Sequence, residues 1–160
     1  MPGQNASAGI ESTAETGSQF IFSDEVGAAR ADGKAEFTLA ASGNASAAGT
    51  VELTFDINET FPLVTLISMV APSPDWFVGV HDLSLFDVAS GEFKQTVVVE
   101  LKVYDAGSED GQGFSLSNAD TQPKQPIELL SRINPADHDF INGTGSGGDF
   151  IATMTFERIK

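Results

Sequence analysis

The chain has 160 residues, of which 23 are acidic and 8 are basic, so its formal net charge is −15 at pH 7. This length favours one globular domain with a sizeable core, and the charge argues against binding nucleic acid or docking unaided on an anionic membrane. The absence of cysteine excludes a disulfide framework, and no apolar segment approaches the length that crosses a bilayer.

The first 18 residues are rich in Ala, Ser, Gly, Thr and Glu. This composition predicts a low-complexity tail, which a neighbouring subunit could order. Gln19–Ser23 is a short strand candidate that could pair within the domain or with another chain. Residues 19–160 are expected to form a single domain. Because the first residues do not resemble a signal peptide, we expect any leader to have been removed or to lie outside this numbering.

From Glu36 onward, short segments of alternating apolar and polar residues are bounded by turn residues. Such alternation is typical of strands with one buried face, and the segment before Pro72 is apolar on both faces, which predicts a central strand. No helical pattern is convincing, so the predicted fold class is all-β, an antiparallel β-sandwich. The predicted strands cover residues 37–41, 51–57, 63–70, 76–86, 97–103 and 150–156.

Two acidic bends follow these strands. Pro72 and Pro74 interrupt any regular strand, and they place Asp75 on a rigid bend. A second bend runs from Asp105 to Asp110. If the two bends meet at one end of a sandwich, their carboxylates require a cation, and calcium suits such oxygen ligands. The alternative is that Asp75 caps a turn and the second bend is a solvated acidic loop.

The segments Pro72-Ser-Pro-Asp-Trp-Phe-Val-Gly-Val80 and Tyr104-Asp-Ala-Gly107 resemble the spondin N-terminal domain, found in F-spondin, mindin and stand-alone microbial proteins. The likeness covers roughly residues 36–160 and is dense over residues 62–126. It implies a C2-like β-sandwich, extracellular, with calcium held in loops at one end. The implied ligands are Asp75, Asp105 and Glu109, with Asp in the animal proteins at the last position. Asp110 is an additional acid that could complete the site.

Other motifs carry weaker signals. Four asparagines lie in glycosylation sequons, and this favours a secreted, extracellular chain. His81-Asp82 and Asp137-His138-Asp139 are interpreted as surface residues, because no nucleophile or metal motif accompanies them, so an enzyme is not expected. The four sequon residues, as possible glycosylation sites, are Asn5, Asn44, Asn58 and Asn142.

Three functions remain open from the sequence. The first is a non-enzymatic calcium-binding adhesion or structural module, with a matrix or cell-surface component as partner. The second is the repeating subunit of an extracellular filament or sheath, a homo-oligomer or polymer assembled through calcium and its N-terminal segment, with Phe20–Phe22 adding to a neighbour's sheet. The third is a glycan- or lipid-binding domain that uses the long polar loop over residues 111–126.

Overall fold

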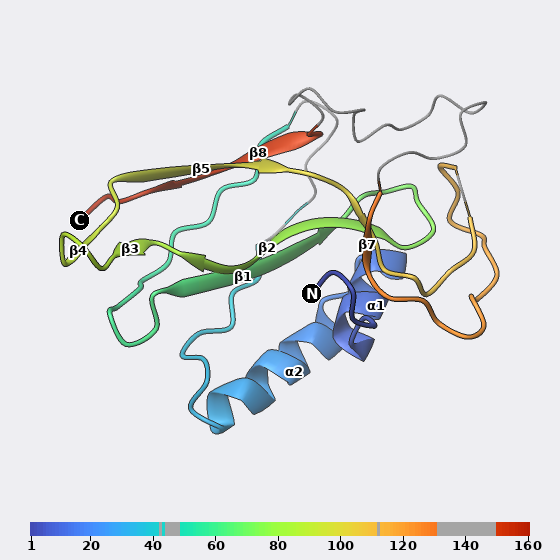
Figure 1. Cartoon of the computed structure of the whole chain (residues 1–160), viewed down its shortest axis with the longest axis horizontal. Coiled ribbons are helices and arrows are strands. Elements are labelled where there is room, and N and C mark those ends of the chain that lie inside the picture. The colour runs from blue at the N-terminus through green and yellow to red at the C-terminus, as the bar shows by residue number, and fades with distance from the viewer. Residues whose placement is uncertain (42, 44–48, 112, 131–149) are drawn as a thin grey trace.

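The computed structural model describes residues 1–41, 43, 49–111, 113–130 and 150–160, and they form an antiparallel β-sandwich with helices on one face (Figure 1). The chain begins with helices α1 (Ala8–Thr16) and α2 (Phe20–Ala31). The strands are β1 (Leu63–Met69), β2 (Trp76–Ser84), β3 (Phe86–Asp87), β4 (Glu92–Phe93), β5 (Thr96–Leu101), β6 (Tyr104–Asp105), β7 (Glu128–Leu129) and β8 (Ala152–Glu157).

Two sheets form the layers of the sandwich. The larger has the strand order β1-β2-β6-β7, and the smaller pairs β5 with β8. Alternate residues of β2 point to opposite faces of the sheet. Trp76 and Val78 therefore pack with Leu101 and Val103 in a buried cluster between the layers. Trp76 and Val103 are fully buried, so the core lies directly behind the bends that carry the candidate acids.

The other face of the larger sheet is covered by the N-terminal helices (Figure 1). Phe77 stacks on Tyr104 on this face, with ring centroids 5.8 Å apart. Residues from α1, α2 and β1 line a cavity of about 120 Å³ next to this pair. Gly79 is required there, because a Cβ would lie 2.2 Å from the Leu66 carbonyl oxygen.

A β-bulge bends the strand pair β1–β2. Two residues of β2, His81 and Asp82, stand opposite the single Thr65 of β1. Asp82 adopts a left-handed φ of 51°, and its N–H donates to the Thr65 hydroxyl at 3.1 Å. The side chains of His81 and Asp82 are exposed, as the sequence predicted for this pair.

The structure corrects the predictions for the N-terminus. Residues 8–16 form a helix rather than a low-complexity tail, and the same chain positions it, since α1 contacts α2 and β1. Before the helix, Gly3 N–H donates to the Ile127 carbonyl and Ile127 N–H donates to the Gln4 carbonyl. The predicted strand over Gln19–Ser23 is also wrong, because these residues begin α2. In so short an apolar run, the spacing of the apolar residues fits a helix and a strand equally well.

Two strand predictions also differ from the structure. Residues 37–41 and 51–57 form no ladder with any described residue, although Phe55 packs edge-on against Phe156 of β8. Strand β1 lies at the end of its sheet's strand order rather than in the centre. The face of β1 that points away from the core is apolar because helix α1 packs against it. The strands predicted over residues 76–86, 97–103 and 150–156 correspond to β2 with β3, β5, and β8.

None of the helices in the described part of the chain is both long and apolar enough to span a membrane.

Candidate metal centre

The first bend is buried, and its own residues cap it. Ser73, Pro74 and Asp75 are each almost fully inaccessible, and the Ser73 hydroxyl accepts the N–H of Trp76 at 3.2 Å. The two prolines end β1 and restrict the chain before β2 begins at Trp76. The bend thus carries an aspartate into the end of the sandwich core, which is unfavourable for a charged group without compensation.

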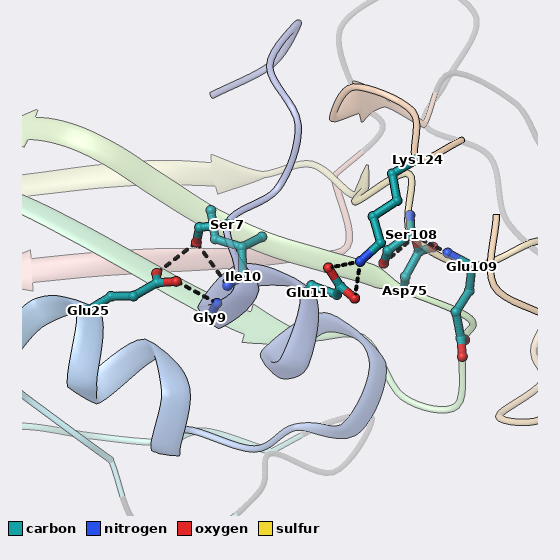
Figure 2. Close-up of polar contacts among 9 residues, drawn as sticks. All are labelled: Ser7, Gly9, Ile10, Glu11, Glu25, Asp75, Ser108, Glu109 and Lys124. Atoms are coloured by element: carbon teal, nitrogen blue, oxygen red, sulfur yellow. Dashed lines mark hydrogen bonds and ion pairs between the residues drawn. The ribbon is translucent and has the colours of Figure 1, made fainter. Parts of the chain in front are cut away.

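The carboxylate of Asp75 binds the second bend (Figure 2). Its Oδ2 atom accepts the N–H of Ser108 at 2.7 Å, the hydroxyl of Ser108 at 3.1 Å and the N–H of Glu109 at 3.1 Å. Its Oδ1 atom is buried and has no hydrogen-bond donor among the described residues. One oxygen therefore anchors Ser108 and Glu109, and the other has no such role among the described residues.

Asp105 lies beside Asp75 at the end of the same sheet. It stands opposite Trp76 in the β2–β6 register, and its Oδ1 atom accepts the N–H of Gly107 at 2.7 Å. Burial, together with the negative charges of Asp75 and Glu128, raises the pKa of Asp105 from 3.8 to about 6. The hydrogen bonds from Gly107 and Trp76 oppose this shift without cancelling it. The protein surroundings of Asp105 therefore disfavour its ionised form.

Glu109 and Asp110 diverge after the second bend. Burial raises the pKa of Glu109, as do the charges of Glu15 and Asp75, and Figure 2 shows its side chain extending away from Asp75. Asp110 is exposed, and its Oδ1 atom accepts the Thr121 hydroxyl at 2.6 Å. The structure therefore brings Asp75, Asp105 and Glu109 to one end of the sandwich, whereas Asp110 is directed to the segment around Thr121.

Sequence reasoning missed Glu15, which α1 brings to this end of the sandwich. Burial raises the pKa of Glu15, a hydrogen bond from Ser108 lowers it, and the charges of Glu11 and Asp75 raise it. One turn earlier, Glu11 forms an ion pair with Lys124 (Figure 2). Ser7 as an N-cap and Gly17 as a left-handed C-cap were the signals in the sequence that could have revealed this helix.

The donor set fits calcium in its chemistry. The candidate ligand atoms are all carboxylate oxygens, and one of them, Asp75 Oδ1, is buried and has no donor among the described residues. As the side chains stand, no group of three or more acidic, histidine or cysteine residues in the described segments is placed to hold a metal ion. Asp75 and Asp105 are held by backbone N–H groups, whereas the longer, half-buried side chains of Glu15 and Glu109 have more rotational freedom.

The long loop over residues 111–126 packs against the end of the sandwich that carries the two bends, residues 72–75 and 105–110. This end is called the metal end below, after the candidate site. The Phe114 ring of the loop meets Trp76 edge-on, with ring centroids 5.5 Å apart. Its later residues return to the second bend, where Thr121 N–H donates to the Ser108 carbonyl and Gln125 N–H donates to the Gly107 carbonyl. The described part of this loop, residues 111 and 113–126, is thus held by specific contacts with the two bends.

The sequons differ in their surroundings. Asn5 is exposed and bridges to Pro126 through its backbone. The amide group of Asn58 is engaged: it donates to Glu36, and its oxygen accepts the N–H of Thr60 at 3.0 Å. Asn44, Asn142 and the cluster around His138 lie outside the described residues.

The fold and the site define a class of protein, a β-sandwich module with acidic residues in the bends at one end. The family model described as Spondin_N matches residues 1–141, and the chain belongs to this family of spondin N-terminal domains. The match includes the N-terminal helices, so it begins well before Glu36, where the sequence resemblance was expected to start.

Curated relatives support the same assignment. Spondin-1 of Mus musculus is 30% identical over 165 residues, an alignment that covers 98% of this chain and 20% of that protein. Spondin-2 of Rattus norvegicus is 30% identical over 117 residues, covering 72% of this chain and 35% of the relative. Spondin-2 of Homo sapiens is 29% identical over 134 residues, covering 83% and 40%. The chain therefore spans two fifths or less of the length of these relatives.

Proposed function

We propose that this chain is a non-enzymatic, extracellular calcium-binding adhesion module, in which calcium orders the two bends at one end of the sandwich. Asp75, Asp105 and Glu109 supply the carboxylates, and Asp110 is a further acid at the rim of the site. The observation that carries the proposal is the buried Asp75 side chain, whose Oδ1 atom has no donor among the described residues.

Charge explains why a cation is needed. Asp75 has donors on one oxygen alone, and the pKa of Asp105 is raised to about 6 by burial and by the Asp75 charge. At neutral pH Asp105 ionises at a cost to folding, and a bound calcium ion would offset that cost. Since calcium is a hard cation that accepts irregular oxygen geometry, two loops and their carbonyl groups can complete its shell.

Membership of the spondin family supports an extracellular setting and a partner on a cell surface or in a matrix. Extracellular modules bind calcium with dissociation constants of about 10⁻⁴–10⁻³ M, so such a site would be filled outside a cell. In this role calcium is structural: it rigidifies the surface formed by the bends and the long loop, which then presents a fixed shape to the partner.

The first test compares the melting temperature and the solution mass of the full chain after chelator treatment, with and without millimolar calcium. Binding to the folded state alone stabilises by about 2.7 kcal/mol when calcium is about 100-fold above its dissociation constant. We expect calcium to raise the melting temperature of the wild type and of Asp87→Asn, a matched change in an exposed bend. Asp75→Asn and Asp105→Asn should lose this gain.

An unchanged melting temperature of the wild type in calcium would refute the proposal. Circular dichroism in chelator shows whether the two site variants fold. If Asp75→Asn does not fold, Asp105→Asn still tests the proposal. The mass measured on the same samples decides the assembly question. A monomer in calcium fits an adhesive module, whereas a calcium-dependent increase in mass would indicate a subunit of a larger assembly.

A further inference from the structure

The face of the larger sheet that points away from the core is not fully packed. Helix α1 packs on β1 and β2 there, and α2 packs on α1 (Figure 1). A cavity of about 120 Å³ remains between these helices and the sheet. Protein interiors are close-packed, and voids larger than a water molecule are few in a domain. This space is therefore large enough to be a site for a small molecule.

The walls of the cavity are mainly apolar and include three aromatic residues. Ile10 of α1, Phe22 of α2 and Ile67 of β1 contribute to them. The stacked pair Phe77 and Tyr104 also lines the cavity, with an angle of 27° between the two ring planes. Aromatic rings pack favourably on one another in offset stacks or edge to face. These walls therefore favour an occupant that is itself a ring.

Few polar groups line the cavity, and two of them are already engaged. The Thr65 hydroxyl accepts the N–H of Asp82 at 3.1 Å, and His81 Nδ1 lies 3.3 Å from the Asp82 carboxylate. Among the described residues, no lysine, arginine or acidic side chain lines the space. A buried water needs several polar partners, and apolar cavities stay dry. The lining thus suits a neutral apolar molecule better than water or an ion.

The backbone beside the cavity departs from ordinary strand geometry. The bulge at His81 and Asp82 bends the strand pair, and Asp82 holds its left-handed φ of 51°. Such a φ is unfavourable for a residue other than glycine, and bulges and strained residues of this kind concentrate at ligand sites. The bulge is therefore a sign of a site that is independent of the volume of the cavity.

The chain before α1 forms one side of the cavity. The N–H of Gly3 donates to the Ile127 carbonyl at 2.8 Å, and the N–H of Ile127 donates to the Gln4 carbonyl at 2.9 Å. Met1 lines the cavity and is exposed to solvent. Because a methionine side chain is unbranched and flexible, Met1 can move without breaking these backbone bonds. This side of the cavity thus offers a route from solvent.

We propose that the cavity binds one neutral aromatic molecule of about the size of benzene. An apolar cavity of about 150 Å³ holds benzene, and the space in this fold has a similar volume. The net charge of −15 further disfavours anionic ligands. None of the lining residues belongs to the acidic bends, so this inference does not rest on the proposed calcium function.

Titration of the full chain with toluene, followed by NMR, tests the proposal. We expect saturable binding of one toluene per chain, with nuclear Overhauser effects between its protons and the methyl groups of Ile10, Ile67 and Ile127. Benzoate keeps the ring but adds a charge, and it should not bind. Toluene that fails to saturate, contacts that fall only on other residues, or equal binding of benzoate would overturn the inference.

A substitution that fills the cavity provides the second test. Ile67→Phe adds bulk on its β1 wall, and it should weaken toluene binding about tenfold or more. Val98→Phe adds bulk at an exposed position of β5 in the other sheet, and it should leave binding unchanged. Wild-type affinity in folded Ile67→Phe would also overturn the inference. If circular dichroism shows that this variant does not fold, Ile10→Phe fills the cavity from the helix side, and the contacts in the wild type still decide the outcome.

Discussion

Two bends of this molecule have nearly the same local structure, but the pKa values of their aspartates are shifted in opposite directions. In the β3–β4 hairpin, the Asp87 carboxylate accepts the N–H of Ala89, two residues later, at 2.9 Å. At the metal end, the Asp105 carboxylate accepts the N–H of Gly107, also two residues later, at 2.7 Å. Each is a turn in which an aspartate bonds its own backbone.

The two aspartates nevertheless titrate in opposite directions. The backbone hydrogen bond from Ala89, with help from Ser90, lowers the pKa of Asp87 below its usual value. Burial and the Asp75 charge raise the pKa of Asp105 to about 6 despite the equivalent bond. A turn aspartate whose charge is satisfied locally is structural. One whose charge remains uncompensated after the local bond has formed indicates a site.

The largest expected effect tests how strongly the metal end depends on contacts across the fold. Asp75→Ala should lower the free energy of unfolding by about 3 kcal/mol or more, because it leaves two buried donors of Ser108 and the part-buried N–H of Glu109 without their charged acceptor. Asp87→Ala should change the stability far less. Chemical denaturation of both variants in chelator measures the difference, and equal losses would contradict the contrast between the bends.

A matched glycine pair sharpens the same comparison. Gly91 in the hairpin and Gly107 at the metal end have φ values of 71° and 72°, but a Cβ on Gly107 would lie 2.2 Å from the Gln125 carbonyl oxygen, whereas Gly91 has open space. Gly91→Ala should cost about 1 kcal/mol for the left-handed conformation, and Gly107→Ala about 3 kcal/mol with the added clash. Similar costs in urea denaturation would show that the loop does not constrain this bend.

The pH dependence of stability should differ in sign between the two aspartates. Because the folded-state pKa of Asp105 is raised from 3.8 to about 6, its folded form binds more protons in that window, and its contribution to stability falls as pH rises. Asp105→Asn should therefore stabilise the chelator-treated protein at pH 7 and flatten this slope. The stability from Asp87, whose pKa is lowered, is present above pH 3.8 and is lost in more acidic solution.

Melting temperatures of Asp105→Asn and Asp87→Asn between about pH 2.5 and about pH 7.5 measure this difference. A lower melting temperature for Asp105→Asn at pH 7 in chelator would contradict the description of Asp105 as an uncompensated charge.

The smallest expected effect concerns helix α1, whose Glu11 pairs with Lys124 of the long loop. Ser7→Ala removes the N-cap of α1 and one partner of Glu25, and it should cost about 1 kcal/mol. Amide exchange should increase in α1 and stay unchanged in the β3–β4 hairpin. Increased exchange in both regions would mean that the substitution acts on the whole fold and that α1 is not a separable element of the metal end.

Much of the sandwich was predictable from local patterns. The alternation of apolar residues predicted β2, β5 and β8 nearly to their ends. Pro72 and Pro74 placed Asp75 on a bend, and the structure has it there. Patterns of this kind depend on residues a few positions apart, which the chain carries in its own order.

The sequence by itself determined which residues are acidic, which strands alternate and where the chain must turn. It did not determine that α1 docks on β1, that β1 lies at a sheet edge, or that α1 brings Glu11 to Lys124. Nor could it distinguish Asp87 from Asp105, because both make the same bond to their own backbone. Only the tertiary structure decided these points, because burial and nearby like charges come from residues that are distant in sequence. Burial and like charges together set the free-energy cost of ionising each carboxyl group.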